Sequence, residues 1–475
     1  MHGTAAETAP GASTAREENK RPPRKVLALA GGGPAAGLHI GALKRLHDRR
    51  KLQSFDVWSL SCIGAWVGIV WQQADFGREV EQTERFFREG VFRDDRSYAR
   101  FPINGVFGPD LATNASALLQ YLCDPASYRG LVLPDQILEA MKDTLHFLRT
   151  PSRWNAGDFN VWMLDSVLAV HPWSRFLTSM VYQSKINGLS RIWYPRSSFL
   201  DAIRFDRLGH AGKPLLYHNA WNLTRQRLEL FTSRDIPHRS YRRIDAKSLC
   251  ACSALPYIES TVEIDGDEYC EGALIDTVSF RNLVEDQGTK LDVWVSRIVD
   301  TDQIRAPRNL TEALGNLCML FAAETGRNDV KLFRFHAKEK YPDVRIVEIP
   351  VSAAVNFDWS RSNLEHGIAE GEKAADAALR ERHAVDKVKD NVKEQLKGDA
   401  VLSDDEARDL LKPSRERSRE YAAVVAKLVL AEQKRCANAS ASATRSDPDG
   451  PREIGKLLEA ILPKAPGTTE DSVEA

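Results

Sequence analysis

Val26-Leu27-Ala28-Leu29-Ala30-Gly31-Gly32-Gly33 is the most informative stretch of this sequence. Five apolar residues in succession are typical of a strand that is buried on both faces of a sheet. Leu38 to His47 follows with apolar residues at helical spacing, so the three glycines join a strand to a helix. The same order then repeats, with a predicted strand at Phe55–Leu60 and a very apolar helix at Gly64–Trp71. These residues predict an α/β domain.

Further strands are predicted in the second half of the chain, separated by helical stretches. Alternating strands and helices favour a mainly parallel central sheet covered on both faces, which is a three-layer α/β/α architecture. The predicted strands are Leu215–Asn219, Arg227–Thr232, Val262–Ile264, Leu291–Val295 and Val344–Ile349.

The composition narrows the function classes. The chain has 475 residues with 65 Lys and Arg, 66 Asp and Glu and a formal net charge of −1, which argues against a nucleic-acid partner. Seven cysteines are too few for a disulfide scaffold, and an odd number fits reduced thiols, so we expect a cytoplasmic protein. The longest uncharged run, 57–74, contains serines, glutamines and glycines, and a buried strand followed by a helix explains it better than a membrane span.

The composition also changes along the chain. Residues 1–24 are predicted to form a disordered leader and 25–385 the α/β domain. A helical extension is predicted at 386–436, and 437–475 is predicted to be a mostly disordered tail. The helices expected in the C-terminal part are one from Ser362 or Asn363 to about 397, a short one after the capping box of Ser403 and Glu406, one at Ser414–Lys434 and one at Ile454–Leu462.

The glycine loop, Gly31, Gly32 and Gly33, is the first candidate site. Glycines at a strand-to-helix turn let backbone N–H groups face a ligand, and the helix N-terminus adds positive potential. Such a loop can hold a phosphate or the oxyanion of acyl transfer. No Lys-Ser or Lys-Thr follows, so the loop is not a P-loop, and the dinucleotide spacing fails at Ala36. A tight turn that needs glycine for packing alone remains the alternative.

The second candidate is Leu60-Ser61-Cys62-Ile63-Gly64. A nucleophile elbow, G-x-S-x-G, places its nucleophile at a sharp turn between a strand and a helix. Here Cys62 occupies the nucleophile position, Gly64 supplies the second glycine and Leu60 replaces the first. A helix N-terminus is expected to lower the pKa of this thiol. The alternative is that Cys62 is a small buried apolar residue, and Ser61 is a competing nucleophile one position out of frame.

A third motif indicates a family. Ser253-Ala254-Leu255-Pro256 precedes Glu271-Gly272-Ala273, and Tyr217 to Thr224 reads Tyr-His-Asn-Ala-Trp-Asn-Leu-Thr. Together with the glycine loop and the turn at Cys62, in this order, these motifs resemble the patatin-like phospholipases over roughly residues 25–385.

The resemblance implies a patatin-like fold and a lipid acyl hydrolase. The Ser–Asp dyad of the family would correspond to Cys62 and Glu271, and Gly31–Gly33 to the oxyanion hole. Gly64 and Gly272 would support the two turns. It implies a lipid or acyl-ester substrate with peripheral membrane contact and no cofactor or metal. It leaves the identity of any protein partner open.

Three functions remain open because Cys62 and Glu271 depart from the family pattern. The first is an ester hydrolase, or an acyltransferase that passes the acyl group to an alcohol or amine. The second is a catalytically silent fold that binds lipid or acyl ligands. The third is a Cys–His–acid hydrolase of another α/β type, with His218 or His238 as the base. His39 is expected to pack rather than to catalyse, and the lone Cys250-x-Cys252 does not favour a metal site.

Overall fold

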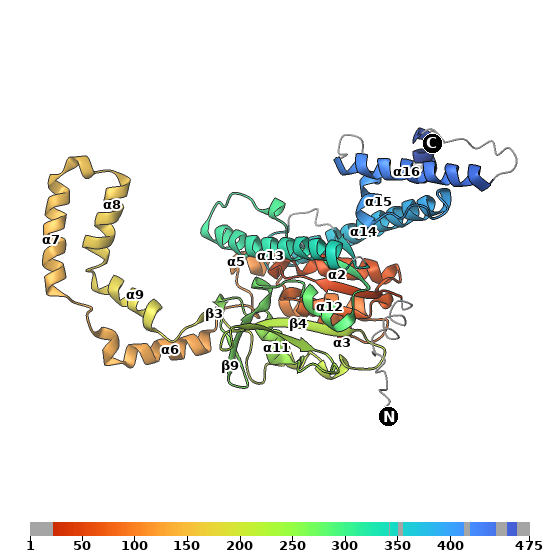
Figure 1. Cartoon of the computed structure of the whole chain (residues 1–475). Helices are drawn as coiled ribbons and strands as arrows, with labels where there is room; N and C mark the ends of the chain where they lie inside the picture. Colours follow the sequence, from red (N-terminus) through yellow and green to blue (C-terminus); the bar gives the residue numbers. More distant parts are fainter. Residues whose placement is uncertain (1–21, 342, 350–354, 413–418, 443–453, 463–475) are drawn as a thin grey trace, which may run out of the picture. The chain divides into compact units, whose positions relative to one another are not determined.

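The computed structural model describes residues 22–341, 343–349, 355–412, 419–442 and 454–462 (Figure 1). The chain forms two compact units. The first unit takes residues 1–60, 278–357 and 363–475, and the second takes 61–277 and 358–362. None of the described helices combines the length and the apolar character that a membrane crossing requires. The predicted leader, and parts of the predicted tail, lie outside the described residues.

The first unit contains four parallel strands in the order β11-β10-β1-β2. These strands are β1 (Arg24–Leu29), β2 (Val57–Leu60), β10 (Leu291–Ser296) and β11 (Arg345–Ile349). Every residue of β2 and β10 is buried, which explains why parallel strands read as continuous apolar runs. The predicted α/β class with a mainly parallel sheet flanked by helices is confirmed.

The two long segments α2 (Ala36–Asp48) and α14 (Arg361–Gln395) pack closely in this unit. A Cβ atom built on Gly41 of α2 would lie 1.9 Å from the carbonyl oxygen of Ile368 in α14. A Cβ atom built on Gly371 of α14 would lie 2.2 Å from the carbonyl oxygen of Leu38 in α2. The two backbones can therefore touch only because both positions are glycine. The same unit holds α12 (Phe280–Gln287) and α13 (Leu310–Lys340), which meet where Phe280 stacks on Phe333.

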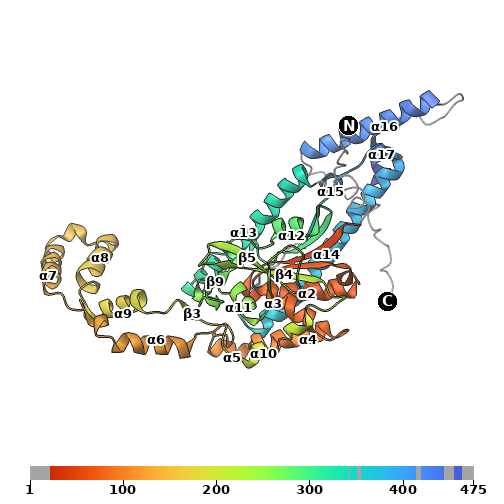
Figure 2. The same ribbon diagram turned by 60° about the horizontal axis from the view of Figure 1, so that its bottom comes forward.

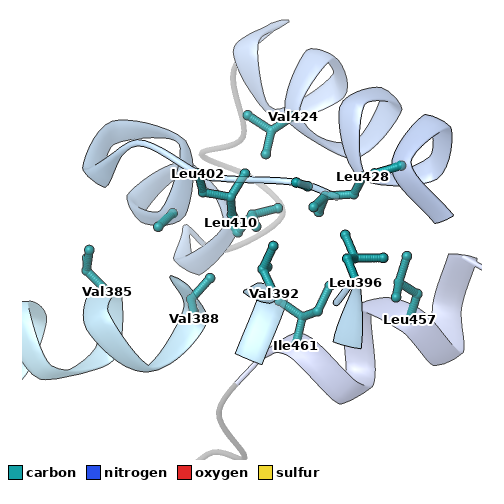
Figure 3. Packing of buried hydrophobic residues seen from close by; sticks show 13 residues of the cluster. Val385, Val388, Val392, Leu396, Leu402, Leu410, Val424, Leu428, Leu457 and Ile461 are labelled. Carbon is teal, nitrogen blue, oxygen red and sulfur yellow. The ribbon is translucent and has the colours of Figure 1, made fainter. Parts of the chain in front are cut away.

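The C-terminal helices of this unit have an apolar core of their own (Figure 3). The end of α14 packs with α15 (Asp404–Leu411), α16 (Arg419–Ser442) and α17 (Ile454–Ile461) through buried side chains such as Val392, Leu410 and Leu428. The capping box predicted at Ser403 and Glu406 opens α15. The first residues of the helix predicted at Ser414–Lys434, up to residue 418, lie outside the described residues. The helix α14 continues across residue 385, where the sequence predicted a domain boundary, and that boundary stays a prediction.

The second unit is built on the strands β4 (Leu215–Asn222), β5 (Arg227–Thr232) and β9 (Asp267–Glu271). β4 pairs antiparallel with both β5 and β9, and β9 also pairs antiparallel with β8 (Val262–Ile264). β5 pairs in parallel with β6 (Arg242–Arg243), and β3 (Gly188–Ser190) pairs in parallel with β7 (Tyr257–Glu259). The helices that carry candidate site residues are α3 (Ile63–Gln73) and α11 (Ala246–Cys252).

The middle of the chain, where no motif was identified, is mostly helical. It contains α4 (Glu79–Arg85), α5 (Asp95–Arg100), α6 (Leu111–Cys123), α7 (Pro134–Arg149), α8 (Ala156–Trp162), α9 (Pro172–Gln183) and α10 (Ser198–Asp201). The last turns of α4 and α8 continue as short π-helices at Phe86–Val91 and Met163–Leu168.

Candidate active site

Cys62 forms the turn between β2 and α3. Its backbone has φ 48° and ψ −123°, a region that a residue with a side chain adopts only at a cost. The turn is closed by the N–H of Gly64, which donates to the carbonyl oxygen of Ser61 at 2.9 Å. The bulk of Leu60 does not prevent this turn, because Leu60 is the buried last residue of β2. The local geometry is that of a strained strand-to-helix elbow.

Glu271 lies at the carboxyl end of β9, opposite Ala220 of β4. Its own N–H donates to the carbonyl oxygen of Ala254 at 2.9 Å, which fixes the end of the strand. The Cys62 thiol and the Glu271 carboxyl group lie close enough for each to change the pKa of the other. The structure therefore brings together the two residues that the sequence placed in the dyad, although they are far apart in the chain.

The pair is buried, and burial controls its protonation. Desolvation raises the pKa of Glu271 to about 7, and the smaller effect of the neighbouring Cys62 thiol acts in the opposite direction. Desolvation also raises the pKa of the Cys62 thiol well above its ordinary value, and the charge of Glu271 raises it further. The lowered thiol pKa expected from the helix N-terminus is wrong, because burial and the neighbouring carboxylate outweigh the bond from the Ile63 N–H. Near neutral pH the thiol keeps its proton, and the neighbouring carboxyl group is present partly as the acid and partly as the carboxylate that could accept a proton.

Two residues that the sequence did not assign to the site complete its surroundings. The Cys62 N–H donates to the Cys252 sulfur at 3.1 Å, so the thiol at the end of α11 lies against the elbow. Asn219 of β4 donates from Nδ2 to the carbonyl oxygen of Asp276 at 2.6 Å. A Cβ atom on Gly272 would lie 2.6 Å from Asn219 Oδ1, so only glycine fits after Glu271. The signal for Asn219 was its place in the stretch that resembles the family strand; the signal for Cys252 was its place just before Ser253.

The glycine loop follows β1 in the first unit. Leu29 pairs with Leu60 in the parallel register of β1 and β2, so the loop and the Cys62 turn both begin at the carboxyl ends of neighbouring strands. Gly33 has φ 52°, and a Cβ atom on Gly32 would lie 2.7 Å from the side chains of Ile298 and Val299. The loop needs glycine for conformation and for space, and its role as an oxyanion hole stays a prediction.

The histidines have other partners. His39 contacts the carbonyl oxygen of Ala30 at 2.8 Å and the Ser296 hydroxyl at 2.9 Å, and burial lowers its pKa to about 4, so it serves packing as predicted. His218 contacts the Ser248 hydroxyl at 3.1 Å and stacks on Phe231, while His238 is exposed. The partner of the Cys62 thiol is an acid, which does not favour a Cys–His–acid site. Within the described residues, no group of three His, Cys, Asp or Glu side chains could hold a metal ion.

Glu259, in β7, is a second buried carboxyl group near this pair. Desolvation raises its pKa to about 8, Glu271 contributes to the increase, and its Oε2 has no hydrogen-bond partner among the described atoms. The Ser190 hydroxyl, which donates to the carbonyl oxygen of Ile258 at 2.8 Å, acts against this increase in the Glu259 pKa. Charging this group opposes folding.

We expect the folded protein to lose stability as Glu259 ionises. Its folded pKa lies above the unfolded value, so the stability that it contributes is complete below about pH 4.5 and is lost as the pH rises through about 8. Glu259→Gln should remove a pH-dependent loss on the order of 3 kcal/mol, measured by urea unfolding at about pH 5 and about pH 9. The control is Glu263→Gln, an exposed position on β8. Equal pH dependence in the wild type and Glu259→Gln would contradict the assignment.

The match to a protein-family model agrees with the motifs. The family model described as patatin-like phospholipase matches residues 27–284. No curated protein sequence matches the chain. Among solved structures, the chain is similar to VipD from Legionella pneumophila, with 12% identity, a TM-score of 0.35 and coverage of 95% of this chain and 94% of that one. It is also similar to the type III effector protein ExoU, with 12% identity, a TM-score of 0.28 and coverage of 94% and 70%.

A complex of ExoU with SpcU from the type III secretion system of Pseudomonas aeruginosa gives 11% identity, a TM-score of 0.23 and coverage of 93% and 75%. The family match covers more than half of the chain and includes both Cys62 and Glu271.

Proposed function

Because the chain belongs to the patatin-like phospholipase family, we propose that it is a lipid acyl hydrolase that cleaves carboxylic esters through Cys62 and Glu271. The observation that carries this proposal is that the thiol at the strained elbow lies next to the buried carboxyl group at the end of β9, close enough for each to change the pKa of the other. The substrate class is an ester of a lipid or phospholipid.

The first half of the proposed reaction forms a thioester. The Glu271 carboxylate takes the thiol proton while the Cys62 sulfur attacks the ester carbonyl carbon, and the carbonyl oxygen gains negative charge. We propose that backbone N–H groups of the Gly31–Gly33 loop stabilise this oxyanion. The parallel register of Leu29 with Leu60, which starts both loops at one edge of the first unit's sheet, supports that role. The carbon–oxygen bond then breaks, and the alcohol leaves with the proton held by Glu271.

The second half releases the acyl group. Glu271 takes a proton from water, the water oxygen attacks the thioester carbon and the fatty acid departs, after which the sulfur regains its proton. An alcohol or amine in place of water would make the same site an acyltransferase.

The raised pKa of the buried thiol is the observation that favours the second candidate, a silent fold that binds acyl ligands.

The pH dependence of hydrolysis tests the role of Glu271. Because only its carboxylate form can accept the thiol proton and its pKa is raised to about 7, kcat/KM should increase with pH through about 7. Glu271→Gln should lower kcat/KM about a hundredfold or more and abolish that inflection. Glu268→Gln, an exposed position on the same strand, serves as the matched control. An inflection that persists in Glu271→Gln would refute the role.

A further inference from the structure

The helices between α6 and α9, residues 111–183, hold together through contacts of their own. Phe147 of α7 stacks on Trp162 of α8 with ring centroids 4.9 Å apart, and Trp162 Nε1 donates to the Thr144 hydroxyl at 3.1 Å. Figures 1 and 2 show α7 and α8 side by side. Phe176 of α9 contacts the rings of Tyr121 and Tyr128. We call residues 111–183 the helical segment.

A second apolar side of α7 is exposed. Leu138, Met141, Leu145 and Leu148 follow one another at intervals of three and four residues, so they share a face. Each of these side chains is 51–59% exposed. Their face is different from that of Ala140 and Phe147, which are buried. An amphipathic helix that is already packed on one apolar side needs no second one for folding.

The neighbouring helices repeat this pattern. Leu111, Leu119 and Leu122 are exposed at helical spacing on α6, and Trp173, Leu177 and Val181 on α9. Exposed apolar surface of this extent marks an interaction site.

The helical segment carries few charges, and this limits the kind of surface that it can bind. Eleven of its 73 residues are charged, whereas 28% of the whole chain is charged, and α6 carries no charged residue. Five are basic and six acidic: Arg129, Lys142, Arg149, Arg153, Arg175, Asp124, Asp135, Glu139, Asp143, Asp158 and Asp165. Arg175, the one charge of α9, is bound internally to the carbonyl oxygens of Gly130 and Ala169. With no basic excess, the segment does not complement an anionic surface.

The exposed aromatic side chains of the segment are of the kind that favours a lipid surface. Trp154, Trp173 and Tyr182 are 60%, 69% and 83% exposed. Trp and Tyr have an apolar ring and a polar atom, and they favour the interface between lipid headgroups and acyl chains. At the turn between α7 and α8, Trp154 also lines an apolar pocket of about 380 Å³ together with Phe147, Leu148 and Phe159.

We propose that the helical segment docks the protein on the surface of a zwitterionic phospholipid bilayer, with the exposed faces of α6, α7 and α9 inserted among the acyl chains near the headgroups. The choice of a lipid partner rests on the proposed function, since an enzyme for lipid esters must reach its substrate at a lipid surface. The segment would bind through apolar area rather than charge, so its binding should depend little on salt.

The test is sedimentation of the full-length protein with phosphatidylcholine vesicles at low and at high salt. We expect binding at both salt concentrations, with a blue shift of tryptophan fluorescence. The double variant Leu138→Glu with Leu145→Glu should bind at least about tenfold more weakly, because it places two carboxylates on the face that would enter the lipid. The matched control, His146→Glu with Arg149→Gln, changes the net charge equally at exposed polar positions of the same helix and should bind as the wild type does.

Two further measurements separate this proposal from the catalytic one. The Leu138→Glu, Leu145→Glu variant should keep hydrolysis of a water-soluble short-chain ester, which also shows that it is folded. Cys62→Ala should keep vesicle binding and lose hydrolysis. Docking is refuted if the wild type does not sediment with vesicles, if only anionic vesicles bind it, or if both double variants bind equally. The wild type could instead self-associate without binding vesicles, and the Leu138→Glu, Leu145→Glu variant could lose that self-association. This result would identify a second copy of the chain as the occupant and would refute docking on a bilayer.

Discussion

Replacing Cys62 by Ala should lower ester hydrolysis by about 10⁴-fold or more, because the proposed reaction uses the Cys62 sulfur as its nucleophile. The same substitution should remove the covalent intermediate. Incubation of the wild type with an activated acyl ester should increase its intact mass by one acyl group, and hydroxylamine should release that group from the thioester. Peptide mapping should place the label on Cys62.

The control for this prediction is Cys123→Ala, which removes an exposed thiol from the helical segment. It should retain full activity and full labelling. Acylation that persists in Cys62→Ala would assign the nucleophile to another residue, with Ser61 and Cys252 as the nearest candidates.

A second variant distinguishes a working enzyme from a catalytically silent fold. Cys62→Ser with Glu271→Asp restores the residue types of the family dyad. Hydrolysis and acylation by the wild type would establish the cysteine site. Activity in the double variant with neither activity nor labelling in the wild type would show that the scaffold is intact and that the natural pair is silent.

Gly41→Val should destabilise the first unit by about 4 kcal/mol, the largest effect on stability that we expect from a single substitution. The new Cβ atom would meet the Ile368 carbonyl oxygen at 1.9 Å, and this obstacle is helix backbone rather than a flexible side chain. The helices α2 and α14 would have to separate, which would open the buried contact between them. Urea unfolding, followed by far-UV circular dichroism, measures the change.

Gly455→Val is the matched control. Gly455 also lies in a helix, α17, but outside its own helix backbone no heavy atom of the described residues lies within 4 Å of a Cβ atom built there. Its effect should stay within about 1 kcal/mol, the range of helix propensity. A stability change of that size in Gly41→Val would mean that α2 and α14 do not pack through these glycines.

Much of the framework could be predicted from local sequence. The runs that end at Ala30 and Leu60 are apolar enough to form buried parallel strands, and the glycines and Cys62 follow them at the positions where such strands turn into helices. Glu271 could be identified because its neighbours match a family pattern. These features depend on a few consecutive residues, whose backbone preferences and hydrophobicity act over short distances.

Which faces of the helical segment stay exposed could not be predicted from local sequence. Its helices have ordinary caps, such as Asp110 before α6 and Asn155 before α8, and they are recognisable as helices. Sequence periodicity, however, could not show that α7 has two apolar faces and that only one of them packs on α8. That distinction depends on which helix lies beside which.

The sequence by itself determined the strand, turn and helix around Cys62 and the family of the chain, and it predicted Glu271 as the acidic partner of Cys62. Only the tertiary structure decided how the site is protonated and what surrounds it. The pKa of the thiol is raised rather than lowered because residues from β4, β9 and α11 exclude water and place a carboxylate beside the sulfur. Backbone conformation follows from neighbours in the chain, whereas desolvation and charge follow from neighbours in space.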